Sequence, residues 1–582
     1  MEENKSEMND LEKLRHSAAH VLAQAVKALF PDVKLGIGPV IEDGFYYDFG
    51  RKKPFTNEDL VKLEAKMKEI VKQNLKIEKV ELSEKEIAAL KKAEPFKKEL
   101  MDDLIKNKVK PTFYKQGDFV DLCRGPHVNY TAKVKAFKLM KVSGAYWKGN
   151  QENEQMQRIY GTCWPTKEEL DAYLKRLEEA DKRDHRRLGK ELELFTFMEE
   201  SPGSAFFLPK GTIIYNELLK LIREEYAKRG YQEVITPLLY DKSLWETSGH
   251  WEHYKNDMFT LKIDGRDFGL KPMNCPSHLL IYKLKLHSYK DLPLRIADFT
   301  PLHRNEVKGA LGGLTRVRKF SQDDAHIFVT EEQIQEEITN VINLVKYVYV
   351  NIFGFTFETM LSTRPEKAMG DEKLWANAEK ALAAALDANK MKYAIAKGEG
   401  AFYGPKIDFK MKDAIGRFWQ LATIQLDFNL PARFNATYEG SDGKKHQVIM
   451  IHRAVYGTPE RFIGVITEHF AGKFPLWLSP VQVRLLTVTD RAIPFAEEVL
   501  AEFKKQNIRA ELDSRTETIP KKVRDAQVDH IPLMITIGDK EVDNKTLAVR
   551  TLDGKVKFGV KTQEFVNSVT AQIKERKLEI TL

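Results

Sequence analysis

Apolar residues near the N-terminus recur with the spacing of one helix face. Between Asn9 and Phe30 this stripe consists of Leu14, Ala18, Val21, Leu22, Ala25, Val26 and Leu29. The pattern predicts an amphipathic helix with Asn9 or Asp10 as its N-cap. His16 and His20 are one turn apart and project together from the face opposite the stripe. Taken alone, this pair favours two solvated histidines on a polar face.

A second pattern, from Leu294 to Phe328, predicts a long β-hairpin. Two β-like runs, Leu294 to His303 and Arg316 to Phe328, flank a polar, Gly-rich tip. A purely structural antiparallel strand keeps its polar residues on one face. Here charged residues recur inside both arms, namely Arg304, Glu306, Arg316, Arg318, Asp323 and Asp324. We therefore expect a lined pocket, and the planar fork of arginine suits an extended anionic ligand such as a nucleoside triphosphate.

The C-terminal region alternates between strand-like and helix-like segments. In chain order these are a strand at Val481–Val488, a helix at Pro494–Gln506, a strand at Ile508–Leu512, a helix at Ile519–Val528 and a strand at Ile531–Ile537. Such alternation predicts a parallel sheet with covering helices. No catalytic group of residues stands out in this region.

Three further segments organise the middle of the chain. Lys167 to Leu194 is dense in charge with sparse leucines, which indicates a solvent-facing connector helix. Ile213 to Arg229 is amphipathic, ends at Gly230 and leads into an extended segment. Pro459 stands near the start of a third helix.

Composition narrows the class of protein. Hydrophobic residues make up 42% and charged residues 31% of the 582 positions, which indicates a soluble globular chain of three or four domains. No apolar run approaches the ~20 residues of a membrane helix, and the N-terminus lacks the pattern of a secretory signal. Three cysteines are too few for a disulfide framework, so we expect a cytoplasmic protein. The net charge of +8 permits a polyanionic partner without requiring one.

Two Cys/His patterns could carry chemistry. Gly125 and Pro126 exclude a helix, so Cys123 and His127 lie on a loop. Together with His16 and His20 they have the ligand types of a tetrahedral zinc site. Cys275, by contrast, has no companion within a few residues, and spacing alone favours a buried small hydrophobe.

The hairpin residues resemble a known family. Arg304-Asn305-Glu306, followed by Arg316-Val317-Arg318 and Phe320, resembles motif 2 of the class II aminoacyl-tRNA synthetases, and Gln322-Asp323-Asp324-Ala325-His326 is similar to the threonyl-tRNA synthetases. The resemblance extends through nearly all of the chain. It implies an α+β multidomain protein with an α+β editing domain (1–180), a helical linker (181–200), a catalytic domain built on an antiparallel sheet (201–478) and an α/β anticodon-binding domain (479–582). Only 15 residues precede His16, so we expect the chain to lack the small ubiquitin-like domain that many members carry there.

The resemblance also implies the synthetic site. It joins Cys275 to His326 and His452 as ligands of one catalytic zinc ion per subunit. It implies that ATP, with Mg²⁺, is bound by Arg304, Arg316, Arg461 and Phe320. The remaining residues that it implies for substrates are Asp324, Gln322, Tyr403, Lys406, Gln420, Gln425, Met273 and Glu306.

A second, hydrolytic site follows from the same resemblance. It would hold His16, His20, Cys123 and His127, with Asp121 and Lys97 as accessory groups and no metal. Glu541 and Arg550 are the implied anticodon contacts, with a surface charge pair as the alternative. We expect threonine, ATP and tRNA(Thr) as partners, editing of seryl-tRNA, and a homodimer by analogy with motif 1 at 213–237. The rivals are a class II ligase for another amino acid and a synthetase-like RNA-binding paralogue without catalysis.

Overall fold

The computed structural model describes residues 8–150 and 152–582. The chain divides into two compact units, unit 1 (residues 1–178) and unit 2 (residues 179–582). Among the described residues, every helix is too short or too polar to span a lipid bilayer. The α+β multidomain fold expected from the sequence is confirmed, while the domain boundaries drawn from it stay predictions.

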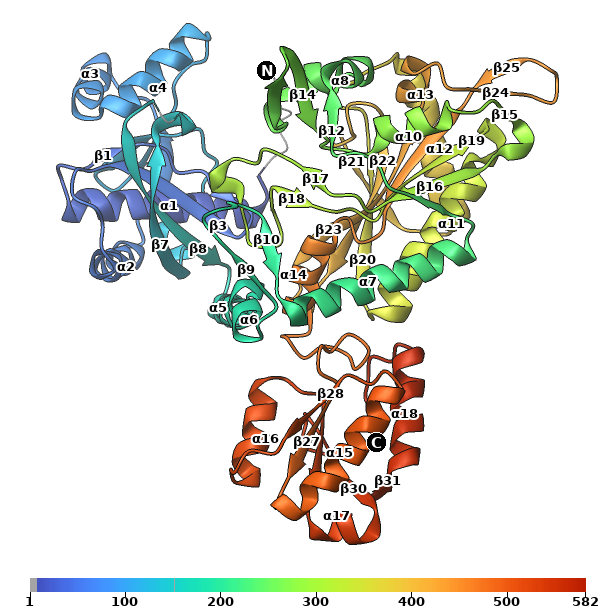
Figure 1. Cartoon of the computed structure of the whole chain (residues 1–582). Coiled ribbons are helices and arrows are strands. Elements are labelled where there is room, and N and C mark those ends of the chain that lie inside the picture. Colours follow the sequence, from blue (N-terminus) through green and yellow to red (C-terminus); the bar gives the residue numbers. More distant parts are fainter. Residues whose placement is uncertain (1–7, 151) are drawn as a thin grey trace. The chain divides into compact units, whose positions relative to one another are not determined.

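Unit 1 is built on a five-stranded sheet with the order β1-β3-β8-β7, in which β2 also pairs with β3 (Figure 1). Its strands are β1 (Lys34–Leu35), β2 (Val40–Ile41), β3 (Gly44–Gly50), β7 (Ala136–Tyr146) and β8 (Gln155–Trp164). Helix α1 (Asp10–Leu29) shares one apolar cluster with this sheet. Asn9 caps the helix and forms a capping box with Glu12, so the predicted N-cap is confirmed.

The polar face of α1 is covered as well. A second sheet, β4 (Ile77–Val80), β5 (Phe113–Gln116) and β6 (Phe119–Leu122), lies against it. The Gln116 amide donates to the His20 carbonyl at 3.2 Å, and the Phe119 ring meets the His20 ring edge-on at 5.5 Å. His20 is only 2% exposed. The expectation of a solvated histidine is wrong for His20, because α1 is enclosed on both faces.

Three more helices complete unit 1. They are α2 (Asn57–Lys72), α3 (Glu84–Ala93) and α4 (Pro95–Lys106). The connector segment that follows, predicted as one solvent-facing helix, is two helices, α5 (Lys167–Lys182) and α6 (His185–Glu191). Asp184 starts the second helix by accepting the Arg186 amide, and His185 and Leu188 on α6 are buried. The single-helix prediction is therefore wrong, since a local cap restarts the helix and its second half is packed.

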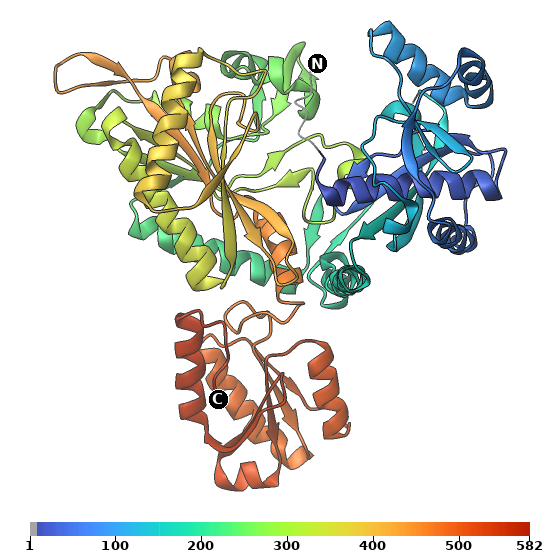
Figure 2. The same cartoon turned by 180° about the vertical axis from the view of Figure 1, so that it is seen from behind.

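Unit 2 contains an eight-stranded sheet with the order β11-β16-β19-β26-β23-β22-β20-β21. The strands are β11 (Gln232–Val234), β16 (Leu294–Asp298), β19 (Asp324–Val329), β20 (Thr356–Ser362), β21 (Tyr393–Ala396), β22 (Lys406–Lys412), β23 (Phe418–Asp427) and β26 (Ile449–Ala454). The two outermost pairs, β11/β16 and β20/β21, are parallel and the inner pairs are antiparallel. Figure 2, seen from behind, shows α11 (Ile334–Lys346) and α12 (Glu372–Ala388) over one face of this sheet.

The predicted long hairpin is present but interrupted. Strand β16 pairs with β19 inside the large sheet, whereas β17 (Leu302–His303) pairs with β18 (Lys319–Phe320) in a separate two-stranded ribbon. We call residues 304–318, between β17 and β18, the hairpin loop. The amphipathic helix α7 (Pro209–Lys228) and the helix α14 (Pro459–His469), with Pro459 at its first position, form as predicted.

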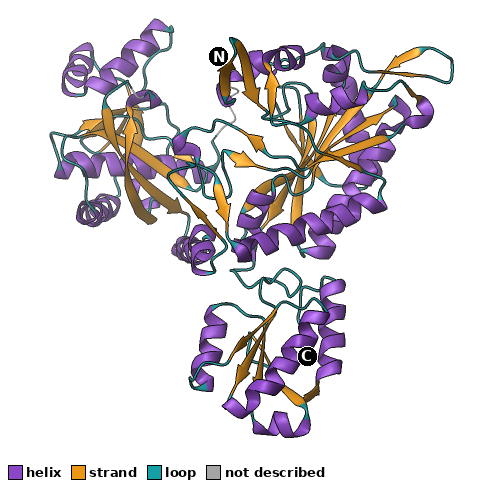
Figure 3. Cartoon of the chain, viewed as in Figure 1, coloured by secondary structure: helices purple, strands orange, loops and turns teal. Residues whose placement is uncertain are grey.

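The C-terminal part of unit 2 has a five-stranded sheet with the order β28-β27-β29-β30-β31 flanked by helices (Figure 3). Its elements are β27 (Val483–Thr487), α15 (Ile493–Lys505), β28 (Ala510–Asp513), α16 (Ile519–Val528), β29 (Leu533–Ile537), α17 (Asp539–Asn544), β30 (Thr546–Thr551), β31 (Val556–Lys561) and α18 (Thr562–Lys574). Strands β27, β28 and β29 are parallel, which confirms the alternating pattern. Strands β30 and β31 are antiparallel, so the sheet is mixed rather than purely parallel.

Candidate functional site

The register of the eight-stranded sheet brings distant polar residues into one row. His326 on β19 lies opposite His452 on β26, which lies opposite Gln425 on β23, which lies opposite Lys406 on β22. Residues directly opposite one another share a face of a sheet. The sheet therefore places side chains 126 residues apart in sequence next to one another on one face.

Cys275 completes a buried cluster beside this row. It is the first residue of α10 (Cys275–Tyr282), and its sulfur and one ring nitrogen each of His326 and His452 lie within 4.8 Å of one another. Nε2 of His326 and Nδ1 of His452 lie 3.0 Å apart. One sulfur and two imidazole nitrogens form a donor set that zinc accepts with a fourth position open. Cys275 is buried in an apolar cluster, as its spacing favoured, but its sulfur also faces two histidines, which the spacing did not indicate.

The other ring nitrogens have partners that fix both imidazoles. His452 Nε2 lies 2.9 Å from an Asp427 carboxylate oxygen, and His326 Nδ1 lies 2.7 Å from His278 Nδ1. Partners of this kind set the tautomer and the ring orientation of metal-binding histidines. Neighbouring side chains therefore orient both imidazoles, an arrangement that is consistent with a metal site.

The wall of the pocket is polar and buried. Asp324 accepts a hydrogen bond from the Asn274 amide at 3.1 Å, and burial raises the pKa of its carboxyl group. The Tyr403 ring stacks on the His452 ring at 4.8 Å, and its hydroxyl donates to Gln425. These four side chains line the space next to the cysteine–histidine cluster.

Met273 and Gln322 are two more of the residues expected to bind substrate. Met273 meets the buried ring of His250 through its sulfur at 3.2 Å. Gln322 lies between the buried residues Ser321 and Asp323, just before β19, and is itself half-buried.

Asp408 contacts several side chains at the Lys406 end of the row. One Asp408 oxygen accepts the Gln420 amide at 2.7 Å, and the other lies 2.9 Å from Lys406 Nζ. Asp408 also accepts the Ser362 hydroxyl at 2.8 Å. The expected residues Lys406 and Gln420 are thus held by a carboxylate that the sequence analysis did not select.

Three arginines surround the ribbon formed by β17 and β18. The Arg304 guanidinium lies 5.0 Å from the centre of the buried Phe320 ring, and Arg316 pairs with Glu306 at 2.7 Å. Arg461 on α14 donates to the Thr315 carbonyl at 3.3 Å. Burial, and then the nearby charge of Arg316, lower the pKa of Arg461. Arg316 and Arg461 are therefore close enough to repel, as expected of two cations that share an anionic ligand.

Two charged residues of the predicted pocket have structural roles instead. Asp323 is fully buried and accepts the backbone amides of Val455 and Tyr456, and burial raises its pKa to about 7. Arg318 donates to the Glu306 carbonyl at 2.9 Å. The expectation that every charge in the hairpin lines the pocket is wrong for these two, because they hold the backbone.

A second cluster lies in unit 1. Cys123 Sγ is 3.2 Å from His16 Nε2 and 3.2 Å from His127 Nε2, and the His16 and His127 rings stack at 4.3 Å. The His20 ring lies 4.7 Å from that of His127. Burial lowers the pKa of all three histidines, that of His20 to about 4, and raises the pKa of Cys123 to about 11. The cluster is therefore uncharged at neutral pH.

An ion pair lies directly behind this cluster. Lys97 on α4 pairs with Asp121 at 2.8 Å, and both side chains are buried. The Tyr47 hydroxyl donates to the other Asp121 oxygen at 2.6 Å. The group lines a cavity of about 1480 Å³ together with His16, His20 and Cys123. All six residues that the sequence analysis grouped in this region come together, although His127 is not part of the cavity lining.

Three family models match the chain. They are the tRNA synthetase class II core domain (G, H, P, S and T) at residues 259–470, an anticodon binding domain at 482–572, and the threonyl and alanyl tRNA synthetase second additional domain at 112–160. The threonine–tRNA ligase of Acetivibrio thermocellus is 52% identical over 97% of this chain and 88% of its own, and that of Fusobacterium nucleatum is 53% identical over 96% and 90%.

The chain belongs to the threonine–tRNA ligase family. Its members are class II aminoacyl-tRNA synthetases, so the family and enzyme class expected from the hairpin residues are confirmed. The solved RNA-binding domain of a threonyl-tRNA synthetase from Cryptosporidium parvum is also similar, with a TM-score of 0.65, 43% identity, and coverage of 67% of this chain and 98% of that one.

In this threonine–tRNA ligase chain, sequence reasoning missed the acids that orient the selected residues. Asp408 and Asp427 stand in ordinary strand patterns, and only the sheet register reveals their partners. Tyr47 was likewise not selected, because it lies in a core strand.

The expected anticodon residues lie on α17 and β30, where Glu541 caps the helix by accepting the Gly538 amide. Within the described residues, no ion pair joins Glu541 to Arg550.

Proposed function

We propose that the chain activates threonine with ATP, transfers it to tRNA(Thr), and hydrolyses seryl-tRNA(Thr) that it forms in error. The observation that carries this proposal is the buried cluster of Cys275, His326 and His452, which leaves one position of a tetrahedron open, together with Arg304 of the hairpin loop over the Phe320 ring. One zinc ion per subunit fits its donor set.

Amino-acid selection follows from the chemistry of this pocket. Threonine and valine are nearly isosteric, so an apolar pocket separates them poorly. A bound zinc ion would act as a Lewis acid towards the amino and hydroxyl groups of threonine, which valine cannot satisfy. Asp324 accepts the threonine hydroxyl proton, while Tyr403 and Gln425 fix the side of the pocket next to His452.

Activation joins the threonine carboxylate to ATP. A carboxylate oxygen attacks the α-phosphorus, the bond to the β-phosphate oxygen breaks, and pyrophosphate leaves. Arg304 stabilises the charge that develops on the α-phosphate, and Arg461 with Arg316 holds the outer phosphates. The adenine ring stacks on Phe320, which Arg304 already covers from one side.

Editing follows from the limits of the same pocket. Serine keeps both groups that the metal would bind and lacks one methyl, a difference worth about 1 to 3 kcal/mol. The unit 1 cluster hydrolyses the seryl ester: a water oxygen adds to the carbonyl carbon and the ribose oxygen leaves with a proton. The neutral ring of His16, which lines the cavity, positions and deprotonates this water. Lys97 binds the ester oxygen, and the cavity of about 1480 Å³ admits the 3′ end of the tRNA.

Recognition of tRNA and assembly complete the proposal. Glu541 and Arg550 contact anticodon bases from the edge of the C-terminal sheet. A homodimer forms along α7 and β11, where Ile235 directly after β11 is 89% exposed although it is a large apolar residue. The protein works in the cytoplasm.

The deciding experiment is amino-acid-dependent ATP–pyrophosphate exchange with threonine, serine, valine and proline, with and without a chelator. Strong exchange with threonine, weak exchange with serine and loss of both on chelation support the proposal. Exchange with proline or serine but not threonine would identify a sister ligase. No exchange, with retained tRNA binding, would identify a non-catalytic paralogue.

A further inference from the structure

His185 on α6 joins three segments that are far apart in the sequence. Its Nδ1 lies 2.6 Å from a carboxylate oxygen of Glu468 on α14. Its Nε2 accepts the backbone amide of Leu314, in the hairpin loop, at 3.0 Å. The side chain is 4% exposed. An imidazole that donates through Nδ1 and accepts through Nε2 is neutral and uses both ring nitrogens.

The hairpin loop is shaped to reach this histidine. Gly313 has a φ of +60°, and a Cβ at this position would lie 2.4 Å from His185 Nε2. On α14, a Cβ at Gly464 would lie 3.2 Å from the Leu314 side chain and 3.4 Å from the His185 ring. Two glycines therefore leave the space in which Leu314 lies fully buried. The contact depends on close backbone approach and is more than a surface hydrogen bond.

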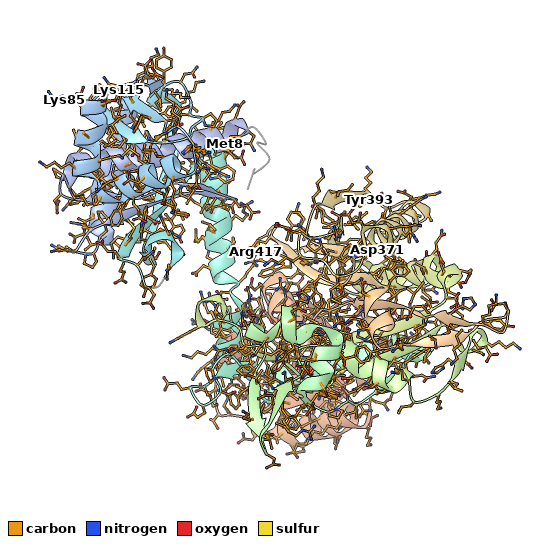
Figure 4. All side chains as sticks on the ribbon, turned by 90° about the horizontal axis from the view of Figure 1, so that it is seen from above. Met8, Lys85, Lys115, Asp371, Tyr393 and Arg417 are labelled. Atoms are coloured by element: carbon orange, nitrogen blue, oxygen red, sulfur yellow. The ribbon has the colours of Figure 1, made fainter. Side chains whose placement is uncertain are left out.

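Glu468, the partner of His185, is itself held by a chain of charged residues. The second Glu468 oxygen pairs with Arg417 (labelled in Figure 4), which pairs with Asp413 at 2.7 Å. Asp413 accepts the Trp419 indole at 3.0 Å, and Arg461 lies over the Trp419 ring at 5.9 Å. Burial by itself would raise the pKa of Glu468, but the hydrogen bonds from His185 and the charge of Arg417 outweigh it and lower the pKa. The carboxylate is therefore charged and keeps the Nδ1 proton of His185 in place.

The loop residues next to Leu314 include Arg316 and contact Arg461, the two arginines assigned to the outer phosphates of ATP. Thr315 accepts Arg461 through its carbonyl, and Arg316 follows directly. The hydrogen bond at Leu314 thus restrains the loop backbone beside Arg316 and beside the Thr315 carbonyl that Arg461 contacts. We propose that His185 is a positioning residue for the adenylation step, holding the hairpin loop on α14 so that Arg316 and Arg461 meet the same ATP phosphates. This inference rests on the proposed function of the site.

A pair of substitutions separates the two ring nitrogens. His185→Asn keeps a donor at the position of Nδ1 for Glu468 and removes the acceptor for Leu314. His185→Gln places an amide oxygen at the position of Nε2 and keeps that acceptor. His446→Asn, at an exposed histidine of the β24–β25 hairpin (Thr437–Glu439 and Lys445–Gln447), is the matched control. Threonine-dependent pyrophosphate exchange is measured with ATP and with threonine varied, together with hydrogen exchange of a peptide covering residues 308–318.

In His185→Asn, kcat/KM for ATP is expected to fall on the order of tenfold, as for loss of one buried hydrogen bond. The KM for threonine and the melting temperature stay near those of the parent, and exchange at the 308–318 peptide rises. His185→Gln is expected to retain most of the parental values. Equal behaviour of the Asn and Gln variants, or unchanged peptide exchange in His185→Asn, would overturn the inference. An inactive parent protein would overturn the proposed function instead, and the peptide exchange would still test the role of His185.

Discussion

Acid should destabilise unit 1 through His20. This imidazole is buried between α1 and the β4–β5–β6 sheet, and burial lowers its pKa to about 4 although Asp121 opposes the shift. In the unfolded chain the same ring takes up a proton near pH ~6.5. Between these two values the unfolded state binds more protons, so the free energy of unfolding falls as the pH falls.

The size of the effect follows from the shift. Each pKa unit corresponds to about 1.4 kcal/mol, so His20 alone costs unit 1 about 3 kcal/mol once the pH is below about 4. Between about pH 7 and about pH 5 the loss is about 2 kcal/mol, or roughly a 20-fold larger unfolded fraction. The substitution His20→Gln removes this titration, while His127, whose pKa burial also lowers, keeps its own.

Cys163 supplies the readout. Its side chain is fully buried in the apolar cluster that contains α1. A dipyridyl disulfide reacts with thiols in mild acid, so Cys163 is labelled in low urea and quantified by mass spectrometry at several pH values. His446→Gln, an exposed histidine in unit 2, is the control. The same rise in Cys163 labelling towards low pH in His20→Gln as in the parent would refute the assignment of this acid sensitivity to His20.

Four further predictions concern unit 2. Cys275→Ala should lose bound zinc by elemental analysis and lose threonine-dependent exchange, while ATP binding persists; metal retained at the parental level would contradict the ligand assignment. Arg461→Ala should lower kcat for pyrophosphate exchange by about 10²- to 10³-fold, because a fixed cation at the phosphates is removed; near-normal exchange would exclude that role. Asp408→Asn should release Lys406 and lower kcat/KM for threonine about tenfold with an unchanged KM for ATP, the cost of losing one charged hydrogen-bond partner. Arg550→Ala should weaken tRNA charging by about 1 to 3 kcal/mol in kcat/KM and leave exchange intact, if it stacks on or pairs with an anticodon base; equal loss of both activities would make Arg550 structural.

Periodicity predicted helices whose apolar residues recur along one face. The helix α1 begins and ends within a residue of its predicted limits, and α16 spans the predicted residues. The connector helix could not be predicted, since its interruption depends on Asp184 as a local cap and on burial of His185 by a helix almost 300 residues later. The split of the long hairpin likewise depends on Asp298, which accepts the Thr300 amide at 2.7 Å at the point where β16 ends.

The residues of the candidate site likewise include some that the sequence predicted and some that it did not. Residues with unusual chemistry for their surroundings, such as Arg304 within a strand pattern, were visible in the sequence and supported a family resemblance. Asp408 and Asp427 were not, because an acid in an otherwise regular strand carries no signal until its cross-strand neighbours are known. Asp323 gave the opposite error: its sequence context is that of a pocket residue, yet its carboxylate holds two backbone amides.

Because the site uses the cross-strand row from His326 to Lys406, it forms only when these strands pair in the correct register. If β26 paired with either neighbour one residue out of register, His452 would point to the opposite face and leave the pocket altogether. Such a shift would separate His452 from Cys275 and His326, with which it forms the buried cluster. Conversely, a substitution within the row changes what the pocket accepts without disturbing the hydrogen bonds of the sheet. The backbone hydrogen bonds of these strands therefore determine the fold, whereas their side chains determine the chemistry of the site.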